Sequence, residues 1–234
     1  MLSRLEMREK YFFASNSPIP TCVDELPETM LGSLLNIIKN YKNSALNNIP
    51  IDEDGEYQVD IIEYEYSVID NLYALFFVNL WSFTEQFLTN DKRLFINLQH
   101  ERNGEKTEEV STIKYNDVFK GWFKQISGTD IKTLSNEATT NLVRILCNNF
   151  KHDGNLRQII PADLDPNATE KYINKGIKQI DKSTVILLGK FYSEARNPDY
   201  SDLDIEKMMY EVGQFCKEFH AKVIEKYKSQ NGLS

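Results

Sequence analysis

Cysteine and histidine are scarce in this chain, with three of each among 234 residues. The cysteines, Cys22, Cys147 and Cys216, are odd in number and far apart, and no Cys-x-x-Cys pair occurs. A disulfide framework needs paired cysteines, and a structural zinc site needs closely spaced cysteine and histidine ligands. We therefore expect no metal, no cofactor and three free thiols that are buried as small apolar side chains.

No apolar run approaches the roughly 20 residues that a membrane-spanning helix needs. Charges are spread through the first segment, Met1 to Phe13, which has no apolar stretch followed by a cleavage site. The motifs GxxxxGK(S/T), GxGxxG, GxSxG and HExxH are all absent. Nucleotide hydrolysis, dinucleotide binding, serine hydrolysis and zinc-dependent proteolysis therefore lack their usual signatures. We expect a soluble cytoplasmic protein with no membrane contact.

Positive charge is in deficit, because the formal net charge is -8 at pH 7. A protein that coats duplex DNA needs the opposite balance, since its Lys and Arg side chains neutralise phosphates. The segment Ile51–Asp70 holds eight acids and no basic residue. Basic residues recur later, between residues 114 and 190, where they could form a local basic face. Charges on separate solvated faces are the simpler interpretation.

Apolar residues at helical spacing predict a mainly α protein, an antiparallel bundle of about five helices. The segment 61–88 has the widest apolar face, and the segment 202–228 carries a second long stripe. Shorter helices are expected at 26–46, at 115–126 with Val118, Trp122 and Ile126 inward, and at 136–151 with Asn136 as N-cap.

Other segments are less regular. Asn103-Gly104 lies between two partly alternating runs, so residues 93–113 are expected to form an exposed hairpin or a long loop. Gly154 is expected to end the helix before it, and residues 173–191 fit either a short strand or a helix. His100 and His220 stand alone in the sequence. The whole chain, 1–234, is expected to be one domain with a core at about 26–228.

Two segments in the middle of the chain form a recognisable pair. Residues 72–88, LYALFFVNLWSFTEQFL, are an aromatic stretch with an internal acid, Glu85. Residues 142–155, LVRILCNNFKHDGN, contain Asn148 and, four positions later, His152. Together they resemble HEPN domains, a helical-bundle family found in many RNases, toxins and antiviral proteins of prokaryotes. The long aromatic helix and the Arg-polar-x-x-x-His signature of that family are the features they resemble.

The resemblance implies a site at the end of the second segment, shared between two copies that pair as a homodimer. His152 would be the general acid or base, because histidine transfers protons near neutrality. The signature arginine position falls on Cys147, and the nearest arginine, Arg144, lies eight residues before His152, roughly 12 Å along a helix axis. The implied roles are catalytic for His152, Asn148 and Lys151, RNA or phosphate binding for Arg144, Asn149 and Arg157, and supporting for Glu85.

Three hypotheses follow and stay open. The protein could be a metal-independent endoribonuclease of an antiviral defence or toxin-antitoxin system, or a catalytically inactive subunit that binds RNA or regulates a partner protein of that system. It could also be a helical bundle with an unrelated interaction role, because any bundle core needs aromatic stripes. In that case His152 would only cap the helix dipole, and Glu85 would lie at the surface or pair with Arg144.

Overall fold

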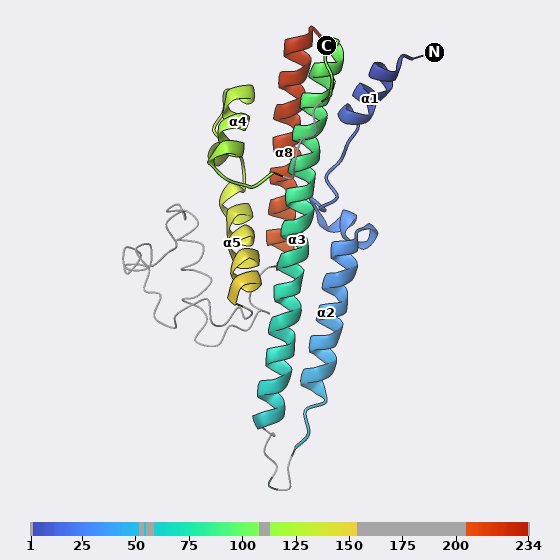
Figure 1. Cartoon of the computed structure of the whole chain (residues 1–234). Helices are drawn as coiled ribbons and strands as arrows, with labels where there is room; N and C mark the ends of the chain where they lie inside the picture. The colour runs from blue at the N-terminus through green and yellow to red at the C-terminus, as the bar shows by residue number, and fades with distance from the viewer. Residues whose placement is uncertain (1, 52–53, 55–58, 108–112, 154–204, 234) are drawn as a thin grey trace. The chain divides into compact units, whose positions relative to one another are not determined.

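The computed structural model describes residues 2–51, 54, 59–107, 113–153 and 205–233. Every regular element assigned in these ranges is a helix, which confirms the expected mainly α fold. None of the helices found there is long and apolar enough to cross a membrane. The elements are α1 (Arg4–Phe13), the 3-10 helix η1 (Val23–Glu28), α2 (Met30–Asn47), α3 (Val59–Arg102), α4 (Asp117–Ser127), the 3-10 helix η2 (Ile131–Thr133), α5 (Glu137–Asp153) and α8 (Ile205–Asn231) (Figure 1).

The chain divides into two compact units that share helices α3 and α8. Unit 1 consists of Met1–Thr21, Ser82–Glu137 and Met209–Ser234. Unit 2 consists of Cys22–Trp81 and Ala138–Met208. Each unit is described separately below, and the expected single domain stays a prediction.

In unit 2, α2 begins later than the sequence pattern predicts. Leu26 and Pro27 belong to η1, and Thr29 caps α2 by accepting a hydrogen bond from the Gly32 N–H at 3.1 Å. The short helix η1 folds back so closely that a Cβ on Gly32 would lie 1.9 Å from the Leu26 carbonyl oxygen. Figure 1 shows α2 beside the first part of α3, where the Tyr41 hydroxyl donates to Glu65 at 2.8 Å.

Helix α3 is much longer than expected, with 44 residues. Its apolar stripe continues past residue 88 through Phe95 and Leu98, both buried in unit 1, so residues 93–102 are helical and the predicted hairpin is wrong there. Asn103-Gly104 ends the helix instead of turning a hairpin. Gly104 has φ of +72°, and the Glu105 N–H donates to the His100 carbonyl at 2.8 Å. Residues 108–112 lie outside the described ranges.

Helix α4, also in unit 1, is rotated relative to the prediction. Ile126 is buried as predicted, but Val118 is 75% exposed and Trp122 is half-buried, whereas Phe119 and Phe123 are buried. The Phe123 ring stacks on Phe219 of α8, with centroids 4.8 Å apart. Two phenylalanine rings bury more apolar area than Val118 can, and this difference sets the rotation of the helix.

Helix α8 carries the predicted stripe, with Met209, Val212, Phe215, Phe219, Val223 and Tyr227 all buried. In unit 1 it runs parallel to α3, because Asp91 contacts His220 and Gln99 contacts Gln230 farther along both helices. Figure 1 shows the same direction for the two helices. This pair departs from the expected antiparallel arrangement, which is typical of helices joined by short loops. Here about 100 residues separate the end of α3 from the start of α8.

Residues 4–20, named here the N-terminal strap, form an element that the sequence analysis did not expect. Ser3 and Glu6 form a capping box that starts α1. Phe12, Ile19 and Pro20 are buried in unit 1, before the core boundary expected near residue 26. Pro20 lies so close to α8 that a Cβ on Gly213 would meet its carbonyl oxygen at 2.3 Å. Only glycine at residue 213 allows this approach of strap and helix.

This close approach predicts opposite effects for two glycine-to-alanine substitutions. Gly213→Ala should lower the free energy of unfolding by about 1–3 kcal/mol, because the strap backbone must move away from the added methyl group. Gly121→Ala in α4 should raise it by about 0.5–1 kcal/mol, because a Cβ there meets nothing within 4 Å and alanine favours a helix. Urea unfolding of both variants measures this, and equal effects would contradict the close packing.

Candidate functional site

Helix α5 presents three of the predicted site residues on one face. Arg144, Asn148 and Lys151 are spaced by four and three residues, which aligns them along the helix. Arg144 and Asn148 are half-buried and Lys151 is exposed, while the intervening residues 145–147 are buried. The site residues therefore lie on the outer side of α5, and Cys147, at the signature arginine position, lies on the inner side.

Arg144 points back along α5. Its Nε–H donates to the Asn141 Oδ1 at 2.9 Å, one turn toward the helix N-terminus. Asn141 itself is buried, with 1% of its surface exposed. This hydrogen bond directs the guanidinium away from Lys151 and the helix end.

The other predicted residues are placed less completely. The backbone of Asn149 and His152 belongs to α5, while Arg157 and the expected helix stop at Gly154 lie outside the described residues. Glu85 is half-buried in unit 1, and Arg144 belongs to unit 2. The pairing of Glu85 with Arg144 stays a prediction. Asn136, the expected cap, precedes α5 with φ of +62° and donates through Nδ2 to Gln214 at 3.0 Å.

The cysteines follow the prediction in two cases out of three. Cys147 and Cys216 are buried, as expected. Cys22 is a free thiol but is exposed, so the expectation that all three are buried is wrong. It precedes η1, which buries only Leu26.

His220 does not stand alone, contrary to the sequence interpretation. Its Nδ1 lies 2.7 Å from Asp91 Oδ2, and both side chains are buried in unit 1. An ionised carboxylate only accepts hydrogen bonds, so with Asp91 ionised the hydrogen of this contact is on Nδ1, and in the neutral imidazole Nε2 then carries the lone pair. A histidine held in this way by a carboxylate is a common arrangement for proton transfer.

The surroundings of this pair are mostly aromatic. The rings of Phe12 and Phe87 lie edge-on to the His220 ring, with centroids 5.6 and 5.8 Å away. His220 Nε2 is buried and has no hydrogen-bond partner among the residues that the structure describes. Leaving such an atom unpaired costs about 1–3 kcal/mol. The pair thus has its proton-accepting atom in a closed apolar setting.

Burial changes the acid-base properties of both neighbours of His220. Loss of water raises the pKa of Asp91, and the hydrogen bond from His220 opposes this rise. Burial also raises the pKa of the Cys216 thiol, to which the nearby Asp91 charge adds. Cys216 therefore stays a protonated thiol, which is a poor nucleophile. Within the described ranges, no three His, Cys, Asp or Glu side chains gather closely enough to hold a metal ion.

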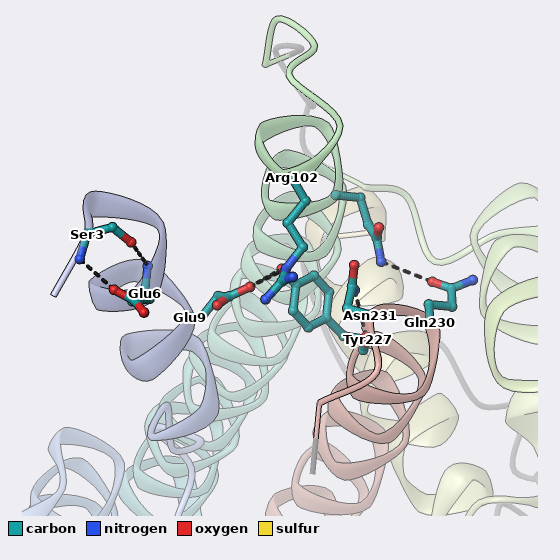
Figure 2. A network of polar contacts seen from close by, with 8 residues as sticks. Ser3, Glu6, Glu9, Arg102, Tyr227, Gln230 and Asn231 are labelled. Carbon is teal, nitrogen blue, oxygen red and sulfur yellow. Dashed lines mark hydrogen bonds and ion pairs between the residues drawn. The ribbon is translucent and has the colours of Figure 1, made fainter.

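A second buried polar cluster joins α1, α3 and α8 in unit 1 (Figure 2). Arg102 Nε–H and the Tyr227 hydroxyl both donate to Glu9 Oε1 at 2.6 Å. Burial, followed by the hydrogen bond to Glu9, raises the pKa of Tyr227, and the same carboxylate raises the pKa of Arg102. Glu9 is 6% exposed, and these two donors satisfy its Oε1 inside the protein.

No protein-family model, curated protein or solved structure matches the chain. The candidate sites therefore rest on the residues and geometry described above. One is the outer face of α5 in unit 2, and the other is the Asp91–His220 pair in unit 1.

Removing the Tyr227 hydroxyl tests the Glu9 cluster. Tyr227→Phe should lower the free energy of unfolding by about 1–3 kcal/mol, because it leaves a buried carboxylate with one donor fewer. Tyr11→Phe is the matched control, since Tyr11 lies on α1, the helix that carries Glu9, and is 68% exposed. Denaturant unfolding should separate the two variants. Equal stabilities would show that the hydroxyl of Tyr227 contributes nothing.

The raised pKa of Asp91 predicts a pH dependence. The folded protein holds the Asp91 proton more tightly than the unfolded chain, so the contribution of Asp91 to stability falls as pH rises above the ordinary value of 3.8 and levels off past the raised pKa. The asparagine in Asp91→Asn does not titrate. The free energy of unfolding of this variant, relative to wild type, should therefore increase between pH 3.8 and the raised pKa of Asp91, as measured by urea unfolding at a series of pH values. A constant difference would contradict the buried titration.

Proposed function

We propose that this protein is a HEPN-like cytoplasmic protein of a prokaryotic defence or toxin system, which binds or cleaves RNA as a homodimer at the end of α5. The alignment of Arg144, Asn148 and Lys151 on the outer face of that helix supports the proposal. These residue types suit a phosphate-rich ligand, since two carry positive charge and Asn148 offers an amide donor. The aromatic long helix that the resemblance requires is present as α3.

In the enzymatic version, cleavage proceeds without a metal. His152 acts either as a general base that takes the proton of the attacking 2′-hydroxyl or as a general acid that gives a proton to the leaving oxygen. Lys151 is exposed one residue earlier and supplies a point charge to the phosphate. Asn148, one helical turn before His152, positions the histidine or the phosphate. Arg144 adds positive charge one turn before Asn148, where its Nε–H donates to Asn141.

Pairing of two copies supplies what one copy lacks. The net charge of -8 opposes RNA binding, and a single α5 end offers few cations. Two α5 ends that face one another would double the local positive charge from Lys151 and Arg144. A homodimer therefore fits the proposed function better than a monomer.

A second candidate function is a catalytically inactive binding or scaffold subunit that regulates a partner protein. The burial of Cys147 favours it, because this side chain is 0% exposed and occupies the signature arginine position. A buried thiol cannot give the bidentate phosphate contact of a guanidinium. This version keeps the helical fold and the outer face of α5 without cleavage.

Cleavage of a mixed RNA pool in EDTA by purified protein tests the proposal. Wild type should cleave, and His152→Ala should lower the rate by about 100-fold or more, because general acid-base catalysis contributes that much. His100→Ala is the matched control and should cleave like wild type, since His100 lies at the end of α3 in unit 1. Dimerisation is checked for all three proteins.

The same samples also decide between the two candidates. RNA binding without cleavage by wild type, in a gel-shift assay, would favour the inactive subunit. Neither binding nor cleavage by a well-folded dimer would count against RNA as the ligand. Equal loss in His152→Ala and His100→Ala would remove His152 from the proposed role.

A further inference from the structure

The N-terminal strap runs along α8 in the opposite direction to that helix. Phe12 contacts the rings of His220 and Tyr227, at centroid distances of 5.6 and 5.8 Å. Farther along, Ser17 hydrogen-bonds Cys216, one turn before His220, and Pro20 lies against Gly213. The strap therefore passes over the stretch of α8 that carries His220, with Phe12 directly against its ring.

The buried part of the strap is small. Within residues 4–20 only Glu9, Phe12, Ile19 and Pro20 are buried. At its outer end, Arg8 pairs with Glu101 and Glu9 accepts from Arg102 and Tyr227. The Arg8 and Glu101 side chains keep 29% and 24% of their surface exposed, so water screens this pair. Phe12 is the main apolar anchor beside His220.

The closed strap leaves one polar atom unsatisfied. His220 Nε2 is buried without a partner in the described part of the chain, whereas buried polar atoms in proteins are nearly always paired. Phe12 packs against the ring from the strap, so movement of Phe12 would uncover that side of the ring to water or to a ligand. The Asp91 contact to Nδ1 involves α3 and α8 alone, so it does not depend on the strap.

We propose that the N-terminal strap is a removable cover over the Asp91–His220 pair, and that the open form presents His220 Nε2 as a proton acceptor to a ligand that carries a hydroxyl group. Asp91 holds the ring through Nδ1, and when Asp91 is ionised and the imidazole neutral, Nε2 is the accepting atom. The other titratable groups near the ring are Cys216, a protonated thiol, and the Glu9 cluster about two turns along α8. This site belongs to unit 1 and is independent of the proposed RNA site on α5.

Acylation by diethyl pyrocarbonate, which attacks histidine only in its unprotonated form, tests the cover in the full-length protein. Mass spectrometry of peptides follows His100, His152 and His220 separately. His220 should react slowly in wild type. In Phe12→Ala its rate should rise by about tenfold or more. Truncating a buried phenylalanine lowers the stability of the packed form enough to shift the equilibrium between closed and open strap by more than tenfold.

Two comparisons make this result specific. Met7→Ala is the matched control, because Met7 is on α1 but is 55% exposed, and it should leave the His220 rate unchanged. The rates of His100 and His152 should stay constant in Phe12→Ala, which distinguishes strap opening from general unfolding. An unchanged His220 rate in a folded Phe12→Ala protein would overturn the proposal.

Hydrogen exchange of wild type provides a test that needs no variant. Backbone amides of α1 should exchange through a partial opening, at least about tenfold faster than amides of α8 around residues 215–223. This difference supports a detachable strap. Equal exchange rates for the two helices would show that the strap leaves only when unit 1 unfolds, and would overturn the proposal even if Phe12→Ala failed to fold.

Discussion

The parallel packing of α8 against the second half of α3 is the constraint on which unit 1 depends. Each helix turns an aromatic stripe inward, and Phe95 and Tyr227 meet edge to face between them, 5.9 Å apart. Parallel packing also brings Asp91 beside His220 and Arg102 beside Tyr227, so both polar pairs become interior. Buried polar groups need partners, and the strap supplies Glu9 to one of these pairs.

The fold could be predicted where apolar spacing is strong, as in α8 and in the first part of α3. The prediction failed where polar residues interrupt the apolar spacing. Asn90-Asp91-Lys92-Arg93 hid the continuation of α3, although Phe87, Asp91 and Phe95 share one face. The strap has few apolar residues, so its burial depends on contacts with α3 and α8 that lie far away in the sequence. Its one local signal was the capping box of Ser3 and Glu6.

The two candidate sites differ in what the sequence reveals. Helical spacing alone places Arg144, Asn148 and Lys151 on one face, because they follow each other at four and three residues. The direction of the Arg144 side chain could not be predicted, since it depends on the local bond to Asn141. The Asp91–His220 pair was missed because Asp91 lies in a polar run and the pairing depends on how two helices far apart in the sequence align. An acid and a histidine on the apolar faces of two long helices are a usable signal of a buried pair.

The exposure of Cys22 affects how self-association must be studied. Among the three cysteines it alone reaches the surface, just after the strap ends. In air, surface thiols of two copies oxidise to an intermolecular disulfide, whereas buried Cys147 and Cys216 are protected. A covalent pair formed in this way would join the copies near the start of η1 and not through the outer face of α5. Reducing conditions, or Cys22→Ser, separate that chemical dimer from one held by packing.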